Sequence, residues 1–206
     1  MKGIQLFKAS QVFVLVTVIA SSISAKSLGE KREVIEKSFP VTASTGLDIT
    51  NQFGEVHVDT WDRNELKVRI EIIVNGKTDD RAQKMLDKID IDIEEGGEIS
   101  FVTRISGNTN TKDGESFEIN YKVSYPSGNQ LSIDNRFGDT YVGSRSGSTD
   151  LEISYGNLKT EDFTGFLNLE LSFGKGSVGS TKESEIDVRY SGLEITSAVV
   201  MEMEQQ

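Results

Sequence analysis

The sequence predicts an all-β protein whose C-terminal part is a β-solenoid of single-stranded, β-helix-like coils, with one short α-helix in the N-terminal half. Apolar and polar residues alternate over most of the chain, which is the pattern of strands with one buried face. The 19 glycines against 2 prolines suit strands joined by tight turns. From Phe137 to Tyr190 an aromatic residue also recurs with a period of about 18 residues, which is typical of stacked repeat units.

The chain begins with the three-part pattern of a secretory signal peptide. Lys2 and Lys8 supply positive charge, residues 12–20 form an apolar run too short to span a bilayer, and small residues follow as far as Ala25. We therefore expect a signal peptide over residues 1–25 and an exported product, periplasmic or at the cell surface. An uncleaved N-terminal anchor is the alternative. No second apolar stretch follows, so no stable membrane span is expected after cleavage.

The composition narrows the classes of function. The chain has no cysteine, which excludes disulfides and a lipoprotein anchor at the cleavage site. Its formal net charge is −11, and cleavage would remove two further lysines. Nucleic acids and anionic membrane surfaces are therefore unexpected partners, because phosphate binding needs clustered lysine and arginine.

After the signal peptide we predict an N-terminal β-rich part, residues 26–130, continuous with a repeat part, residues 131–206, as one elongated domain. Alternation and turn residues predict strands in the N-terminal part at residues 32–41, 47–58, 66–74, 89–95, 98–105 and 117–125.

One helix is predicted over about residues 78–89. Thr78 is a suitable N-cap, and Asp79 and Asp80 would oppose the helix dipole in the first turn. Apolar residues then form a single stripe, which we interpret as core packing: Ala82, Met85, Leu86 and Ile89.

The repeat part begins with the segment LSIDNRFGDTYV (131–142), which matches LDITNQFGEVHV (47–58) almost position by position. The same pattern returns in residues 151–158, 167–178 and 186–195, with apolar residues four and usually two places before each aromatic. The structural repeat residues are Phe53, Gly54, Phe137, Gly138, Tyr155, Gly156, Phe173, Gly174, Tyr190 and Gly192.

We expect the aromatic rings of the repeat to form an internal ladder in the core, in preference to an exposed stripe that stacks on carbohydrate. The glycines are expected to form corners, because glycine accepts backbone angles that a side chain forbids. An antiparallel meander is the alternative fold, since successive hairpins can repeat with a similar period.

Several segments in this order resemble the bacterial "putative adhesin" family of exported β-solenoid proteins, a family of unknown molecular function. They are the Asn-x-Phe-Gly units at 51–54 and 135–138, the run TWDRNELKV (60–68), the segment LDKIDI (86–91) and the segment YGNL (155–158). The resemblance covers nearly all of the mature chain and implies a cell-envelope repeat protein without assigning catalytic residues. Family members carry further coils, whereas this chain stops soon after Tyr190.

No catalytic, metal or cofactor site is predicted. His57 is the only histidine, and without cysteine it cannot build the usual zinc or Cys–His nucleophile sites. The segment 108–114 fails as an EF-hand start because Lys112 occupies a ligand position. A carbohydrate-active β-helix is the enzymatic alternative, and its carboxylates would be Asp134, Asp139, Asp150 and Asp187. We favour a solvated acidic face for these four residues.

The leading functional hypothesis is a non-enzymatic cell-envelope protein, an adhesin-like binding or scaffold module for an unknown envelope protein or glycan. Alternatives are the carbohydrate-active enzyme above and a component of an envelope-sensing system. Trp61, in a polar turn, is the one aromatic expected to contact a ligand. The apolar residues 193–203 would expose strand edges at the end of the stack, which predicts end-to-end self-association.

Overall fold

The structure is a computed structural model, and it describes residues 29–107 and 114–205, with side chains as far as Ser197. The predicted signal peptide and residues 108–113 lie outside the described residues. Within the described residues, one helix, α1 (Asp79–Leu86), accompanies fourteen strands. The strands are β1 (Glu30–Pro40), β2 (Gly46–Gln52), β3 (Val56–Trp61), β4 (Glu65–Asn75), β5 (Ile89–Glu94), β6 (Glu98–Ile105), β7 (Ser116–Pro126), β8 (Leu131–Arg136), β9 (Thr140–Val142), β10 (Thr149–Ser154), β11 (Leu158–Thr160), β12 (Phe163–Ser172), β13 (Lys175–Arg189) and β14 (Gly192–Gln205).

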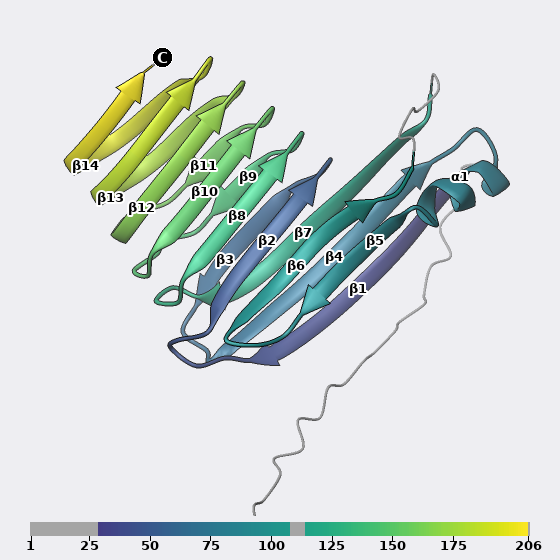
Figure 1. Cartoon of the computed structure of the whole chain (residues 1–206), viewed down its shortest axis with the longest axis horizontal. Coiled ribbons are helices and arrows are strands. Elements are labelled where there is room, and N and C mark those ends of the chain that lie inside the picture. The colour runs from purple at the N-terminus through teal and green to yellow at the C-terminus, as the bar shows by residue number, and fades with distance from the viewer. Residues whose placement is uncertain (1–28, 108–113, 206) are drawn as a thin grey trace, which may run out of the picture.

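The predicted all-β class is confirmed. The strands form one mixed, 14-stranded sheet in the order β1-β4-β7-β3-β9-β11-β13-β12-β10-β8-β2-β6-β5, and β14 pairs with β13. The long strand β13 pairs with β11 near its start and with β12 further along, so the sheet passes from one layer to the other. Figure 1 shows these two layers, with α1 and β1 at one end and β14 at the other.

Strands of the repeat part pair in parallel with their own equivalents. Thr149 is in register with Leu131 on one side and with Leu167 on the other, which are the equivalent positions of the coils before and after it. Leu167 is in turn in register with Ser184 on the next strand. Parallel pairing between successive coils is incompatible with the antiparallel meander considered above.

The two segments that resemble each other most closely stack directly on each other. Leu47 is in register with Leu131, and Val56 with Thr140, although β4 to β7 and α1 lie between them in the chain. Strands β1, β4 and β7 pair antiparallel, and β5 and β6 pair antiparallel as well. The segment between β3 and β8, which we call the inserted segment, therefore adds strands to both layers. Strands β2 and β8 are therefore neighbours in one layer, and β3 and β9 are neighbours in the other.

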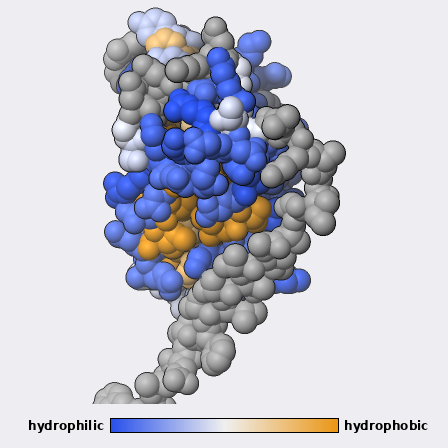
Figure 2. Space-filling model, turned by 90° about the vertical axis from the view of Figure 1, so that its right-hand side faces the viewer, coloured by the Kyte–Doolittle hydropathy of each residue, from blue (hydrophilic) through white to orange (hydrophobic). Residues whose placement is uncertain are grey.

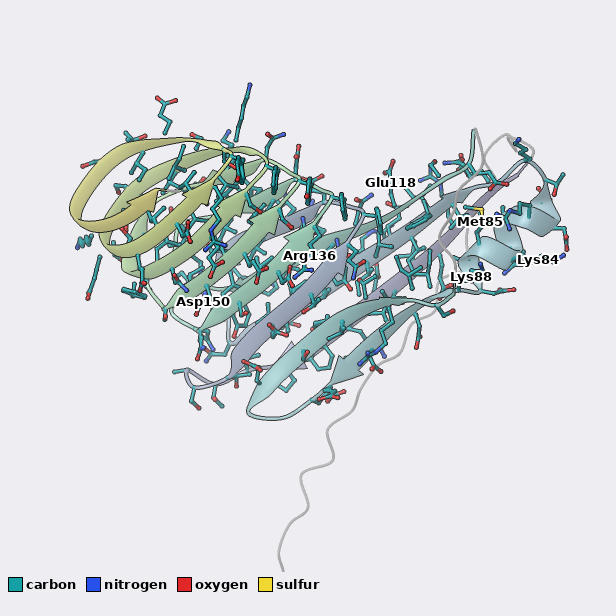
Figure 3. The ribbon with its side chains drawn as sticks, turned by 45° about the horizontal axis from the view of Figure 1, so that its top comes forward. Lys84, Met85, Lys88, Glu118, Arg136 and Asp150 are labelled. Carbon is teal, nitrogen blue, oxygen red and sulfur yellow. The ribbon has the colours of Figure 1, made fainter. Side chains whose placement is uncertain are left out.

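Helix α1 begins as predicted, and its cap is visible in the contacts. The Thr78 hydroxyl accepts a hydrogen bond from the Arg81 backbone amide at 3.2 Å. Ala82 and Met85 are buried, whereas Lys84 is exposed (Figure 3). The helix ends three residues earlier than predicted because Ile89 already belongs to β5. Among the described residues no helix has the length and apolarity needed to cross a membrane.

The core lies between the two layers. Every residue four or two places before a repeat aromatic is buried: Ile49, Asn51, Ile133, Asn135, Leu151, Ile153, Leu169, Leu171, Ile186 and Val188. At the end that carries β1 and β5, the half-buried Ile35 and Ile91 pack against this core. Figure 2 faces this end and shows apolar surface between hydrophilic side chains.

A series of hydrogen-bonded, buried polar side chains crosses the core near β2. The Thr103 hydroxyl donates to Asn51 Oδ1 at 3.0 Å and contacts the Tyr121 hydroxyl at 2.8 Å. Burial raises the pKa of Tyr121 to about 12, and the pKa of Tyr125 is likewise raised to about 12, mainly by burial.

The free energy of unfolding should therefore decrease at alkaline pH. Between about pH 10 and 12 a tyrosine of the unfolded chain loses its proton while Tyr121 in the folded chain keeps it, which favours unfolding. The contribution of Tyr121 to stability is fully present below about pH 10 and is lost as the pH rises through about 12. Urea midpoints of Tyr121→Phe at about pH 8 and pH 11 should show a shallower loss than those of the wild type. An identical loss in both proteins would exclude Tyr121 as a source.

Candidate binding surface

Five aromatic side chains stack face to face at the corner between the two layers, and we call this row the aromatic ladder. It runs Phe53–Phe137–Tyr155–Phe173–Tyr190, with ring centroids 4.7–5.1 Å apart and interplanar angles of 2–14°. Each ring comes from one coil, and the spacing follows the distance between hydrogen-bonded strands. The ladder therefore extends along the stacking direction of the strands.

The ladder lies outside the core, which corrects the expectation of an internal ladder. Phe137, Tyr155 and Phe173 are about half exposed, and Tyr190 is 79% exposed. Phe53 forms the covered end, since Phe117 packs edge-on against it at 5.0 Å. The chain turns at each aromatic residue, so the alternation that places the residues two and four places earlier inside no longer applies.

The turn is made by the aromatic residues themselves. All five have positive φ, between 52° and 62°. Bulky residues rarely adopt this left-handed conformation, which costs about 1–2 kcal/mol per residue. Stacking stabilises the ladder by about 0.5–1.5 kcal/mol per ring pair, which is similar in size to the strain of the left-handed conformation. A strained conformation at five equivalent positions is the kind of feature that suggests a functional constraint.

The glycines after the aromatic residues have a different role from the one expected. Gly54, Gly138, Gly156 and Gly174 do not have positive φ. A Cβ atom on Gly138 would overlap the carbonyl oxygen of Gly54, and the same overlap recurs at the next two coils. Glycine is therefore required because successive backbones approach closely. A Cβ atom on Gly192 would meet open space, so this position carries no such requirement.

An acidic column runs beside the ladder, on the outer face of β8, β10, β12 and the second half of β13. Asp134, Glu152, Glu170 and Asp187 are in register on successive strands. Arg136 forms ion pairs with Asp134 and Glu152 at 3.1 and 3.3 Å, and Arg189 pairs with Asp187. Glu170 makes no ion pair among the described residues.

A scan against protein-family models finds no match, and a search of curated proteins finds none. Solved structures give distant likenesses. A "putative cell adhesion protein" from Clostridium sporogenes shares 12% identity over 87% of this chain and 100% of that chain, with a TM-score of 0.34. A "putative adhesin" from Bacteroides fragilis shares 12% identity over 84% and 97%, also with a TM-score of 0.34.

A "putative lipid binding protein" from Parabacteroides distasonis shares 8% identity over 86% of this chain and 97% of that chain, with a TM-score of 0.31. The first two descriptions name the same kind of protein as the family that the sequence resembles. With TM-scores below 0.5, all three likenesses are distant.

The four candidate catalytic carboxylates are not gathered into one site. Asp134 and Asp187 lie in the acidic column three strands apart, which is about 14 Å. Asp150 accepts a hydrogen bond from the Asn168 amide at 2.7 Å. Figure 3 labels Asp150 and Arg136 on the repeat part.

Asp139 follows the aromatic turn and precedes β9, so it belongs to the other layer. It accepts two hydrogen bonds from Asn157, at 2.8 and 3.0 Å. This aspartate links neighbouring coils and does not face the acidic column.

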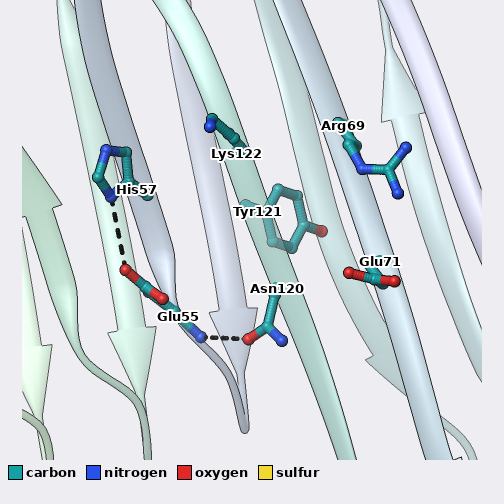
Figure 4. A pocket seen from close by; sticks show the side chains of 7 residues that line it. All are labelled: Glu55, His57, Arg69, Glu71, Asn120, Tyr121 and Lys122. Carbon is teal, nitrogen blue, oxygen red and sulfur yellow. Dashed lines mark hydrogen bonds and ion pairs between the residues drawn. The ribbon is translucent and has the colours of Figure 1, made fainter.

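A shallow hollow of about 270 Å³ lies on the outer face of β3, β7 and β4 (Figure 4). It is lined by Glu55, His57, Arg69, Glu71, Asn120, Tyr121 and Lys122. His57 points outward, stacks on Tyr141 at 4.5 Å and contacts Asp59 at 3.1 Å. In the described part of the chain, no three histidine, aspartate or glutamate side chains are grouped so that they could hold a metal ion.

Trp61 lies at the end of β3, away from the ladder, and is half-buried. Its indole N–H donates to the Glu65 carbonyl oxygen at 2.8 Å, and the Arg63 guanidinium lies 5.0 Å from the ring centroid. Its expected ligand contact stays a prediction, and the ladder offers the larger aromatic surface.

Neutralising Glu170 should stabilise the protein. In-register like charges on neighbouring strands are unfavourable, and Glu170 stands between Glu152 and Asp187. We expect Glu170→Gln to raise the free energy of unfolding by about 0.5 kcal/mol, an effect that should shrink with added salt. Thermal melts at low and high ionic strength measure this.

Glu152→Gln is the matched control, since it removes the same charge together with an ion pair to Arg136. A smaller gain is expected there. A lower melting temperature for Glu170→Gln at low salt would contradict the repulsion.

Proposed function

We propose that this chain is an exported, non-catalytic envelope protein built as a β-solenoid whose coils repeat with the period of its aromatic residues, and that the aromatic ladder is the surface that binds its partner. The parallel registers of β8, β10, β12 and β13 support the solenoid description. The observation that carries the binding function is the row of half-exposed rings, each held in a left-handed backbone conformation.

Two physical arguments favour binding over a purely structural role. Contiguous exposed aromatic surface is uncommon on soluble proteins and marks contact sites, where aromatic residues supply much of the binding energy. A glycine or asparagine would make the same turn with less strain, so the aromatic residues are not needed for the turn itself. The aromatic side chains therefore add an exposed surface that the turn itself does not require.

Replacing two central rings tests the proposal. Asparagine tolerates the left-handed conformation, so Tyr155→Asn with Phe173→Asn should preserve the fold while removing the exposed surface. The full chain, immobilised, is exposed separately to solubilised envelope proteins and to envelope glycans. We expect the double variant to retain at least about tenfold less material than the wild type.

Lys122→Asn, on the outer face of β7, is the matched control and should bind as the wild type does. Equal retention by the wild type and the double variant would refute the ladder as the binding surface. Accumulation of cleaved glycan in the same mixtures would refute the non-catalytic assignment.

We also propose that the chain associates with itself through residues 193–203. Within the described residues β14 pairs on one side with β13 and on the other with no strand. A long unpaired edge accepts further strands, and Leu193 and Ile195 lie in it. Size-exclusion chromatography should show a concentration-dependent dimer that Ile195→Pro abolishes. A monomer at all concentrations would contradict this proposal.

Export rests on residues 1–25, whose pattern is that of a signal peptide. Cell fractionation with surface proteolysis should find the processed chain outside the cytoplasm, and the protease sensitivity then separates a periplasmic from a surface-displayed protein. Unprocessed chain in the cytoplasm would overturn the assignment.

A further inference from the structure

The ladder offers ring edges to a ligand, because each ring face is covered by its neighbours. The four stacks have interplanar angles of no more than 14° and centroid distances of 4.7–5.1 Å, which leaves no room for a sugar ring between them. Only the outer face of Tyr190 lacks an aromatic partner among the described residues. Face-on stacking of a glycan along the ladder is therefore excluded, and a ligand must lie across the edges.

The backbone at the ladder is already paired. The amide of Phe137 donates to the Ser154 carbonyl oxygen, that of Tyr155 to Ser172, and that of Phe173 to Arg189, all at 3.0–3.1 Å. A partner strand could not add to this corner by backbone hydrogen bonds, as it can at a free sheet edge. The ligand must be held by side-chain contacts and needs no hydrogen bonds from the ladder backbone.

The spacing of the rings selects among extended polymers. The exposed rings, from Phe137 to Tyr190, cover about 14 Å at one ring per 4.7–4.9 Å of strand spacing. A polyproline II helix advances about 9.3 Å per three-residue turn, which matches two ring spacings within a few tenths of an ångström. A β-strand repeats its side chains every ~6.7 Å and an α-helix every ~5.4 Å, so both drift out of register with the rings.

The acidic residues beside the ladder favour a ligand with positive charge. The acidic column follows the exposed rings strand by strand, and Glu170 in it has no ion-pair partner among the described residues. Between Glu170 and Phe173 stands the small Ser172, and Ser154 takes the same place one coil earlier. A cationic side chain that projects from a ligand on the ring edges would reach Glu152 or Glu170 over these serines.

From these observations we propose that the aromatic ladder binds an extended, lysine- or arginine-containing, proline-rich segment in the polyproline II conformation. This inference rests on the proposed binding function and names its partner class. Proline rings lie on the edges of alternate aromatic rings, and one basic residue faces the neighbouring carboxylates Glu152 and Glu170. About five ligand residues fit the exposed length, since each advances about 3.1 Å.

Fluorescence anisotropy with labelled peptides and the full chain tests the proposal. The probe is (Pro-Pro-Lys)₅, and the comparison peptides are (Gly-Gly-Lys)₅ and (Pro-Pro-Glu)₅. We expect (Gly-Gly-Lys)₅ to bind at least about fivefold more weakly, because it must be ordered on binding, and (Pro-Pro-Glu)₅ to show no binding. Tyr155→Asn with Phe173→Asn should weaken (Pro-Pro-Lys)₅ at least about tenfold, and Glu170→Gln about two- to threefold.

Equal binding of the two lysine peptides would overturn the proposal, because charge alone would then explain it. Binding of (Pro-Pro-Lys)₅ that is unaffected by the double variant would also overturn it. Glu170→Gln keeps the test informative if the double variant does not fold. If (Pro-Pro-Lys)₅ fails while retention of envelope material still depends on the ladder, this inference falls and the proposed function stands. If neither depends on the ladder, both fall.

Discussion

Replacing Gly138 with alanine is expected to cost about 3–5 kcal/mol of the free energy of unfolding. The added Cβ atom would overlap the carbonyl oxygen of Gly54 on the neighbouring coil. The backbone fixes the position of the Cβ atom, and its partner is a backbone atom, so no side chain can rotate away to relieve the contact. Relief would require the two coils to separate, which would also disturb the buried contacts between β2 and β8.

Gly192→Ala provides the matched control. It adds the same methyl group at the far end of the stack, where a Cβ atom meets open space and φ is not positive. We expect a change within about 0.5 kcal/mol there. Urea unfolding of both variants gives the comparison, and a loss below about 1 kcal/mol for Gly138→Ala would contradict the close-approach role of the ladder glycines.

The strands and the helix could be predicted from local patterns because their side chains obey the period of a single element. Alternation correctly predicted the buried residues of β2 and β8, and Thr78 as N-cap correctly predicted the start of α1. The similarity between residues 47–58 and 131–142 also indicated which segments would stack, since equivalent coils bury equivalent faces.

The exposure of the ladder could not be predicted from that same alternation. Each aromatic stands two places after a buried residue, so a continuing strand would place it inside. The left-handed φ of Phe137 and its equivalents turns the chain at that point, and the ring leaves the core. The glycine that follows is then required by a neighbour distant in the sequence, a contact that no local pattern contains.

The burial of Arg145 is a second feature that local sequence patterns do not predict. It stands in the polar run GSRSGS (143–148), which indicates a solvated loop, yet its side chain is fully buried. The guanidinium donates to the carbonyl oxygens of Pro126 and Asn129 and lies 5.4 Å from the Tyr125 ring centroid. Burial lowers its pKa to about 10. These acceptors lie at the end of β7 and in the β7–β8 turn, so only the folded chain brings them to Arg145.

Exchanging Asn135 for isoleucine is the second substitution expected to have a large effect, a loss of about 2–4 kcal/mol of the free energy of unfolding. The buried Asn135 amide donates to the carbonyl oxygens of Gly54 and Gly138 at 3.2 and 3.1 Å, and its Oδ1 accepts from the Asn51 amide at 3.2 Å. Isoleucine has a suitable size but would leave these buried groups without their partner.

The next coil supplies the reciprocal change, because Ile153 is in register with Asn135 and is equally buried. Ile153→Asn would bury an amide where the coil has an apolar side chain, and we expect a loss of similar size. Ile153→Val should cost only about 0.5–1.5 kcal/mol. Urea unfolding of the three variants separates the effects of polarity and volume. If Asn135→Ile were as mild as Ile153→Val, the Asn51–Asn135 pair would not be holding β2 and β8 together, and the junction between the inserted segment and the repeat would rest on apolar packing alone.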